Sequence, residues 1–421
     1  MKGMHLSLLS LVFVFLMAGL APAATPDTAV KAASAKAMPL FTEQLKALVS
    51  MDSGSSDVLG INAKKDYLVA ELKKAGMEIT EVEATGNRKG TYNIVARLQG
   101  AGKAKLMIIA HYDTVWPKGE AAKRPFRIEN DIAYGPGVSD EQHSIAGVIA
   151  LVQMFKELKF NDFAVFSLVL NGDEEISSLG SKDLIMAEAA KHDLVFSMEG
   201  GGDDGDTIFV SCRGLAYADI IVQGVAAHSG ENPKDGRNAG VEMARQMLNM
   251  LDLGDDQKWT DVNWTIGSYG TVANMIPDTA KATVNLRASY MSEMDRVKAE
   301  IEKRIQNTTD KDCKVTLNYR AGRPPFEPNA KTELVADKAE AIYKNELGRS
   351  LKRLHMGGGS DANFAFQKAP TIEGMGVGGG NWHSQKESLN LKHVPDRLYL
   401  LMRLIQETCK GNTVPIGTPD R

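Results

Sequence analysis

Residues 163–175 of the chain read FAVFSLVLNGDEE, an apolar run followed at once by an acidic cluster. A continuous run of aromatic and branched residues is typical of a strand that is buried on both faces, as in a parallel sheet. In open α/β sheets, ligands bind beyond the carboxyl ends of the strands. Adjacent carboxylates repel each other unless one binds a cation and another can hold a proton. The stretch therefore predicts a metal ligand beside a general base, with an acidic solvated loop as the alternative.

Two further apolar runs end in a potential ligand. Residues 105–110 lead into His111, and residues 194–198 lead into Glu199. Between them, the turn-rich residues 134–139 lead into Asp140, and a helical pattern follows over residues 145–158. Because the carboxyl ends of parallel strands lie at one edge of a sheet, three such endings indicate a common site.

The composition is that of an ordinary globular protein, with 421 residues, 43% hydrophobic and 24% charged. This length favours two domains over one. The formal net charge of −4 gives no indication of nucleic acid or of an anionic membrane as a partner. Cys212, Cys313 and Cys409 match no zinc-binding spacing, although one disulfide with one free thiol is possible in an oxidising compartment.

The first 24 residues differ from the rest of the chain. Lys2 precedes an apolar run over residues 6–20, and small residues follow at 21–24. This pattern is typical of a secretory signal peptide and predicts an exported protein, periplasmic or secreted, without membrane attachment after cleavage. A retained N-terminal anchor is the alternative. Residues 25–36 are small and polar and predict a loose arm after the cleavage site.

The pattern changes between Cys212 and Gly322, where the order of elements is β-α-β-β-α-β. The expected strands are 216–222, 264–269, 281–286 and 313–319, and the expected helices are 241–251 and 292–308. This order is that of a ferredoxin-like domain. Helix and strand patterns resume from residue 332 to residue 406, after the break at Pro324 and Pro325.

We therefore expect an α/β protein with a smaller domain inserted into a larger one, which is tolerated where the two ends of the insertion lie close together. The larger, catalytic domain would contain a central, mostly parallel sheet and comprise residues 25–212 and 324–413. The inserted lid or dimerisation domain would comprise residues 213–323, and residues 414–421 would form a tail.

The candidate ligands together provide two imidazoles and three carboxylates. They are His111, Asp140, Glu175, Glu199 and His383, the last of which follows the glycine-rich residues 374–380. Imidazole and carboxylate suit Zn²⁺ or similar cations. One carboxylate that bridges two cations, with one His and one carboxylate on each, would leave room for a shared water of lowered pKa. Asp113, two residues after His111, is placed to accept the other imidazole N–H.

Five motifs carry a family resemblance. They are HYDTV at 111–115, GVSD at 137–140, DEE at 173–175, Glu199 and WHS at 382–384. In order and spacing they resemble those of the M20 family of dinuclear zinc metallopeptidases, and the chain looks most like its bacterial glutamate carboxypeptidase (carboxypeptidase G) branch. The likeness covers about residues 40–410, including the inserted domain. It implies a zinc-exopeptidase fold with two Zn²⁺ per subunit, with Co²⁺ or Mn²⁺ as possible replacements.

The resemblance also implies a role for each motif residue. Asp140 would bridge the metals, His111 and Glu199 would bind one, and Glu175 and His383 would bind the other. Glu174 would be the general base, which agrees with the interpretation of adjacent carboxylates from the residues alone. His228 would reach the active site of the partner in a homodimer and polarise the scissile carbonyl.

The substrate's free carboxylate would be held by a second set of residues that match family positions: Asn274, Arg287, Gly358, Gly359 and, as a weaker candidate at the hinge exit, Arg323. Arginine suits a carboxylate because it pairs with it through two hydrogen bonds. Glycine lets backbone N–H groups approach the substrate closely.

The chain departs from the family pattern at two places. The family commonly has Asp-Asp-Lys-Gly around the bridging Asp, whereas residues 140–143 here read DEQH, so His143 becomes a candidate for contact with solvent or substrate. Glutamate-specific members also carry a Lys between the positions of Glu199 and Arg213. None is present here, and the nearest equivalent is Thr207. The metal chemistry is thus expected to be intact, while the side-chain preference is open.

These features predict an exported, homodimeric, zinc-dependent exopeptidase. It would release a C-terminal amino acid, with glutamate favoured, from small peptides or N-acyl amino acids. An aminoacylase or dipeptidase with another preference is the alternative, and a catalytically silent metal- or peptide-binding protein is a remote one. The presence of Glu174 beside the ligand set favours an enzyme.

Overall fold

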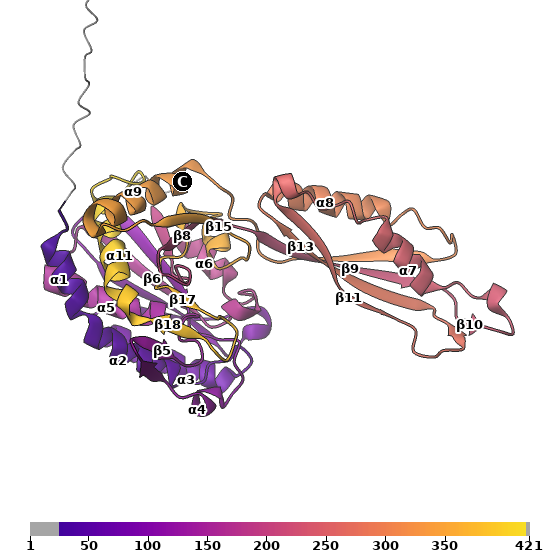
Figure 1. Ribbon diagram of the computed structural model, residues 1–421, viewed down its shortest axis with the longest axis horizontal. Helices are drawn as coiled ribbons and strands as arrows, with labels where there is room; N and C mark the ends of the chain where they lie inside the picture. Colours follow the sequence, from indigo (N-terminus) through magenta and orange to yellow (C-terminus); the bar gives the residue numbers. More distant parts are fainter. Residues whose placement is uncertain (1–24, 418–421) are drawn as a thin grey trace, which may run out of the picture.

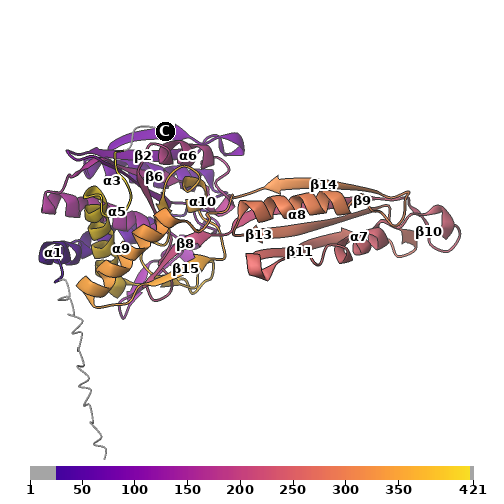
Figure 2. The same cartoon turned by 90° about the horizontal axis from the view of Figure 1, so that it is seen from above.

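The computed structural model describes residues 25–417, which form two lobes joined end to end (Figure 1). The predicted signal peptide and the end of the predicted tail lie outside the described residues. The main lobe contains both ends of the described chain, and the second lobe extends from it as a narrower body (Figure 2).

The main lobe is built on a six-stranded sheet with the order β1-β2-β6-β3-β7-β16. Its strands are β1 (Glu78–Glu83), β2 (Tyr92–Gln99), β3 (Ala104–His111), β6 (Phe163–Asn171), β7 (Leu194–Ser197) and β16 (Thr371–Ile372). The pairings β6–β3, β3–β7 and β7–β16 are parallel, whereas β1–β2 and β2–β6 are antiparallel. The predicted α/β class with a central, mostly parallel sheet is therefore confirmed, and the three apolar runs lie side by side in its parallel part.

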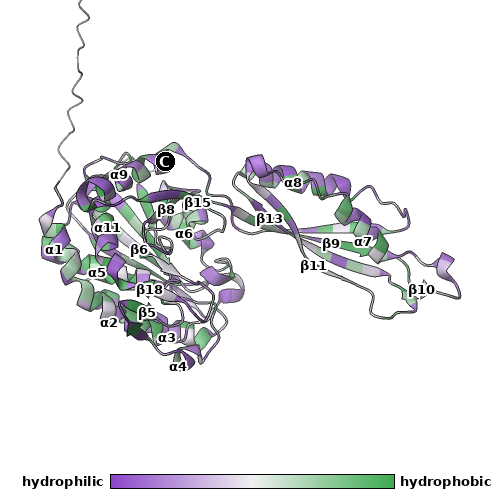
Figure 3. Cartoon of the chain, in the orientation of Figure 1, coloured by the Kyte–Doolittle hydropathy of each residue, from purple (hydrophilic) through white to green (hydrophobic). Residues whose placement is uncertain are grey.

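Helices cover both faces of this sheet. One face packs against α1 (Thr28–Lys36), α2 (Met38–Val49), α3 (Val58–Lys74), α5 (Gln142–Leu158), α9 (Ala330–Leu347) and α11 (Val394–Cys409). The other face packs against α6 (Lys182–Ala189) and the short α10 (Ala362–Ala365). Successive strand residues alternate between the two cores, as Met107 and Ile108 do, because side chains of a strand point to opposite faces. Figure 3 shows hydrophobic residues concentrated on the sheet and α5.

The expectation of a loose arm over residues 25–36 is wrong, because residues 28–36 form α1. The Asp27 side chain caps this helix by accepting hydrogen bonds from the backbone N–H groups of Ala29 and Val30, both at 3.0 Å. Val30 and Ala33 are buried in the main core. Alanine has the highest helix propensity, and small residues permit close helix packing, so the composition that suggested an arm also suits a docked helix.

Two small sheets complete the main lobe. Strand β8 (Thr207–Cys212) pairs in parallel with β15 (Lys352–Met356). A four-stranded antiparallel sheet has the order β17-β18-β5-β4. It joins β4 (Arg127–Glu129) and β5 (Ile132–Tyr134) to β17 (Gly379–Gly380) and β18 (Ser388–Asn390). The second sheet matters for the site, because it brings the turn before Asp140 beside the segment that contains His383.

The second lobe is a four-stranded antiparallel sheet with the order β11-β13-β9-β14. The strands are β9 (Gly214–Gln223), β11 (Thr260–Tyr269), β13 (Thr279–Ala288) and β14 (Lys314–Ala321), and helices α7 (Ala239–Leu248) and α8 (Met291–Arg304) share a core with the sheet. Apart from two short strands, the order along the chain is that of a ferredoxin-like domain. Those short strands, β10 (Ala227–His228) and β12 (Met275–Ile276), pair with each other at the end farthest from the main lobe (Figure 1).

Cys212, Cys313 and Cys409 are free thiols in the structure, so the possible disulfide is not formed. Among residues 25–417, no helix combines the length and the apolar composition that crossing a bilayer requires.

Candidate active site

Three neighbouring strands place candidate ligands at one edge of the main sheet. His111 is the last residue of β3 and is in register with Asn171, the last residue of β6. Glu174 and Glu175 follow β6 in a short 3-10 turn, and Glu199 lies two residues after β7. The expected gathering of strand ends therefore occurs, because β6, β3 and β7 are adjacent and parallel.

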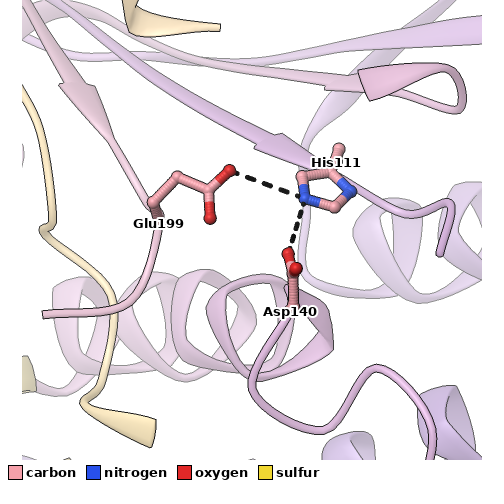
Figure 4. Close-up of side chains that lie close together, drawn as sticks. All are labelled: His111, Asp140 and Glu199. Carbon is pink, nitrogen blue, oxygen red and sulfur yellow. Dashed lines mark hydrogen bonds and ion pairs between the residues drawn. The ribbon is translucent and has the colours of Figure 1, made fainter. Parts of the chain in front are cut away.

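The carboxylate of Asp140 lies between the two imidazoles. Its Oδ1 is 3.2 Å from His111 Nε2, and its Oδ2 is 3.0 Å from His383 Nε2. On one side, Glu199 Oε1 is 3.7 Å from His111 Nε2 (Figure 4). On the other, Glu175 Oε2 is 3.3 Å from His383 Nε2. The result is two groups of three possible ligands that share Asp140, and the atoms of each group lie within 4.8 Å of one another.

The charges and unpaired atoms of this cluster fit cations. Burial and neighbouring acidic groups raise the pKa of the Glu199 carboxyl well above its usual range. Burial also raises the pKa of Asp140, but hydrogen bonds to His111 and His383 outweigh it and hold that pKa well below its usual value. Glu175 Oε1 is buried with no hydrogen-bond partner among the described residues. A buried carboxylate cluster with an unpaired oxygen is stabilised when cations bind to it.

Asp113 connects the two strand ends. Its carboxylate lies 3.3 Å from His111 Nδ1 and accepts the backbone N–H groups of Glu174 at 3.1 Å and Glu175 at 3.2 Å. The Ser55 hydroxyl donates to it at 2.7 Å. A proton shared at Nδ1 leaves Nε2 as the free imidazole nitrogen, directed at Asp140. Asp113 therefore orients His111 and at the same time fixes the turn that carries Glu174 and Glu175.

Arg323 is buried against Glu174 in this structure. Its guanidinium donates to Glu174 Oε1 at 2.7 Å, to the Glu174 carbonyl at 2.8 Å and to Asp361 Oδ1 at 3.0 Å. Burial raises the pKa of the Glu174 carboxyl to about 8, and the charge of Arg323 opposes that rise. Arg323 was expected to hold a substrate carboxylate, but in this structure it is paired with the carboxylates of Glu174 and Asp361.

The remaining predicted substrate residues lie away from this centre. His228 is exposed, and its Nδ1 accepts the backbone N–H groups of Gly230 and Glu231. Asn274 lies beside it, because its carbonyl accepts the Ser229 N–H at 3.0 Å. This pair sits at the far end of the second lobe (Figure 1). Within one chain, the structure does not bring His228 and Asn274 to the candidate ligands.

Arg287 and the glycines differ in what surrounds them. Arg287, on β13, donates to Asn285 Oδ1 at 3.1 Å. A Cβ added at Gly358 would meet no atom within 4 Å, whereas one added at Gly359 would lie 3.0 Å from the Arg213 carbonyl oxygen. Gly359 therefore lies close to the protein's own backbone and Gly358 does not, and the approach of both glycines to a substrate carboxylate stays a prediction.

The two departures from the family pattern have local explanations. His143 is fully buried in α5, and burial lowers its pKa to about 3, so the expected contact with solvent or substrate is wrong. The side chain is buried because the first turn of α5 packs under the glycine-rich segment, where Gly376 lies against His143. Thr207 is buried next to Gly202, and Arg213 forms an ion pair with Asp261.

Sequence reasoning missed three buried charged residues around the centre. Glu141 Oε2 accepts the His111 backbone N–H at 3.0 Å. Lys64, on α3, donates to Gln142 Oε1 at 3.0 Å, and burial lowers its pKa to about 7. Glu387 contacts the turn that carries Asp140. A lysine in an amphipathic helix and an acid in a loop look like surface residues, so no signal in the sequence distinguishes them.

An α/β fold with two ligand groups around one carboxylate at the strand ends is an arrangement suited to two-metal hydrolysis. Residues 107–407 match the peptidase family M20/M25/M40, and the chain belongs to this family. It is 34% identical over 397 residues to carboxypeptidase G2 of Pseudomonas sp. (strain RS-16), covering 94% of this chain and 95% of that protein. The chain is therefore a metal-binding hydrolase of the metallopeptidase class.

Solved structures of low sequence identity share the fold. A tripeptidase from Staphylococcus aureus matches with a TM-score of 0.76 and 20% identity, covering 89% of this chain and 99% of that chain. The YXEP protein of Bacillus subtilis, described as a dinuclear metal-binding peptidase of the M20 family, matches with a TM-score of 0.69 and 15% identity. That match covers 90% of this chain and all of the other.

Proposed function

We propose that the protein is a zinc-dependent exopeptidase that releases a C-terminal amino acid, with glutamate favoured, from small peptides or N-acyl amino acids. The observation that carries the proposal is the Asp140 carboxylate between His111 and His383, with Glu174 beside the ligand candidate Glu175. The similarity to carboxypeptidase G2 over almost the whole chain supports a carboxypeptidase. The sequence pattern of residues 1–24 supports export to the periplasm or the exterior.

The two ligand groups would hold one cation each. His111 and Glu199 would bind the first, Glu175 and His383 the second, and Asp140 would bridge them. Imidazole and carboxylate ligands suit Zn²⁺, and Co²⁺ or Mn²⁺ would be accepted by the same donors. When bound, the cations supply Lewis acidity, which lowers the pKa of water and polarises the scissile carbonyl.

The side chains around the centre would move and hold protons. Glu174 takes a proton from the attacking water and delivers it to the leaving amine, which is general base and then general acid catalysis. Asp113 keeps His111 in the tautomer whose Nε2 faces Asp140. Arg323 holds Glu174 at the edge of the cluster through its ion pair. The substrate carboxylate would be bound by Arg287, with Gly358 and Gly359 near it. Asn274 would take part from a second copy of the chain, because each chain keeps its own Asn274 at the far end of the second lobe.

A matched panel of substrates tests the proposal. Acylated amino acids and dipeptides that end in Glu, Asp, Ala, Leu or Lys are incubated with the zinc-loaded protein, and the freed amino acid is assayed. We expect glutamate to be released fastest, because the chain is similar over almost its whole length to carboxypeptidase G2, of the glutamate carboxypeptidase branch. Arg287 would bind the C-terminal carboxylate that all these substrates share. Preference for another residue would make the protein an aminoacylase or dipeptidase. If protein that contains both metals releases no amino acid from any substrate, the protein is a catalytically silent binding protein.

We further infer a homodimer formed by the second lobe. Strand β11 is the edge of its sheet, and α7 packs beside it, with Tyr269 against Gly240. Four large apolar side chains on and near these elements are at least 66% exposed: Leu248, Leu251, Ile266 and Tyr269. An open strand edge beside an apolar face is covered in most proteins, and strand pairing with a second copy would cover both. In such a dimer, His228 of one subunit would lie at the active site of the other, because within one chain it lies far from the candidate ligands.

Mixed dimers test whether His228 acts across the interface. We expect His228→Ala and Glu174→Gln homodimers each to lose most activity, about 10²-fold or more. When equal amounts of the two variants are unfolded and refolded together, half of the dimers are mixed, and each mixed dimer has one complete site. About a quarter of wild-type activity should return. If His228 acted within its own chain, the mixture would stay as inactive as its components.

A further inference from the structure

Glu387 is a buried acid that the proposed chemistry does not use. It is 1% exposed and lies between His383 and strand β18. Its Oε1 accepts the backbone N–H of Ser139 at 2.9 Å and of Asp140 at 3.1 Å, and the Ser139 hydroxyl lies 3.4 Å from it. Its Oε2 accepts the backbone N–H of Gly137 at 2.9 Å and the indole N–H of Trp116 at 3.1 Å. One carboxylate thus satisfies three N–H groups of a single turn.

This turn depends on an outside acceptor. Gly137 has a φ of 74°, and the N–H groups of Gly137, Ser139 and Asp140 converge on the Glu387 carboxylate, whereas the N–H of Val138 donates to the Gly135 carbonyl at 3.3 Å. Backbone N–H groups that converge in this way form an anion site. Here the anion is a side chain of the chain itself. Buried N–H groups without a partner cost free energy, so the turn keeps this shape only while the carboxylate is present.

Both ligand groups depend on that turn. Asp140 is the residue that the two groups share, and its backbone N–H is one of the three bound by Glu387. His383 lies on the same segment as Glu387, four residues earlier. The Glu387 side chain therefore connects the loop of His383 to the loop of Asp140. These two loops are more than 240 residues apart in the sequence.

We propose that Glu387 is a positioning residue that fixes the Asp140 carboxylate between the two cation sites. Its carboxylate contacts three backbone N–H groups, the Ser139 hydroxyl and the Trp116 indole rather than a candidate ligand atom, so it acts through the backbone of the turn. This inference rests on the proposed metal centre. It predicts a specific defect: because Asp140 belongs to both groups, loss of Glu387 should weaken both cation sites together.

The test is cation binding by the Glu387→Gln variant after its metals are removed by chelation. A carboxamide has one acceptor oxygen, and its NH₂ group would face N–H donors of the turn or of Trp116. Titration with Zn²⁺ by calorimetry, and with Co²⁺ by visible absorption, reports affinity and ligand geometry without turnover. We expect both affinities to fall about 10–100-fold and the Co²⁺ spectrum to change.

Three comparisons make the outcome decisive. Glu199→Gln and Glu175→Gln should each weaken mainly one site. Glu188→Gln, which removes another buried acid paired with Arg97 and Lys191, should bind both cations as the wild type does. If a folded Glu387→Gln variant binds both cations with wild-type affinity, the proposed role of Glu387 is wrong, while the proposed metal centre is unaffected. Failure of the wild type to bind cations would overturn the centre itself.

If Glu387→Gln does not fold without metal, Glu387→Asp takes its place. Aspartate keeps the charge but is one methylene shorter, so it cannot reach all the donors at their present distances. Weakened binding at both sites supports the proposal, and unchanged binding contradicts it. A role limited to overall stability would change the thermal unfolding of the metal-free protein while leaving cation affinity as it is.

Discussion

Replacement of Glu174 by glutamine is expected to lower kcat about 10²–10⁴-fold while both cations stay bound. Glutamine has the volume of glutamate but cannot take a proton from water at neutral pH. Its amide oxygen can still accept a hydrogen bond from Arg323, which also keeps Asp361 as a partner. Alanine would instead leave the buried guanidinium short of one partner and add a stability cost. Glu174→Gln therefore tests the proton transfer more specifically than Glu174→Ala does.

The measurement combines steady-state kinetics with metal analysis of the same preparation. Glu188→Gln is the matched control, because it removes a buried, ion-paired carboxylate of α6 that contacts Arg97 and not the candidate centre. The control should retain kcat within a few-fold of the wild type. Undiminished turnover by the Glu174→Gln protein with full metal content would exclude Glu174 as the general base.

Replacement of Asp140 by asparagine should remove both cations at once. Each oxygen of the carboxylate faces a different imidazole, at 3.2 Å from His111 and at 3.0 Å from His383. A carboxamide keeps one acceptor oxygen, and its NH₂ group would point at the other site. We expect metal content after dialysis to fall well below one ion per subunit, and activity to be lost with it.

Asp173→Asn is the matched control for this variant. Asp173 is a buried acid just beyond the end of β6, but its carboxylate accepts hydrogen bonds from Gly180 and Ser181 and belongs to neither ligand group. This control should keep its metal. If the Asp140 variant retained one cation with wild-type affinity, Asp140 would serve a single site and the bridge would be wrong.

The elements that carry the ligands can be predicted from the amino-acid sequence alone. The sequence predicts buried strands at residues 105–110, 163–170 and 194–198, and the structure has strands β3, β6 and β7 there, with every bound within one residue. The reason is physical: a strand covered on both faces has no polar side, so its sequence is almost continuously apolar. A strongly polar residue closes the run, and it is His111 as the last residue of β3 and Asn171 as the last residue of β6.

The sequence does not predict which individual polar residues are buried. His143 and Lys64 are fully enclosed, although a histidine near a helix start and a lysine in a helix are usually exposed. Helix α1 was missed for a related reason, since Val30 and Ala33 become a core face only when the rest of the main lobe packs against them. The composition of a segment does not show which other parts of the chain pack against it.

How the parts of the centre come together depends on the packing of the whole chain. The order β6-β3-β7 sets His111 between the two acidic strand ends, and the pairing of β18 with β5 carries His383 and Glu387 to the Asp140 turn. The ion pair of Arg323 with Glu174 and the bond from Asp140 to Glu387 join residues 149 and 247 positions apart. Periodicity along a chain reports which face of an element is buried. Which elements pair depends on the free energy of burying all those faces together, and one segment does not contain that information.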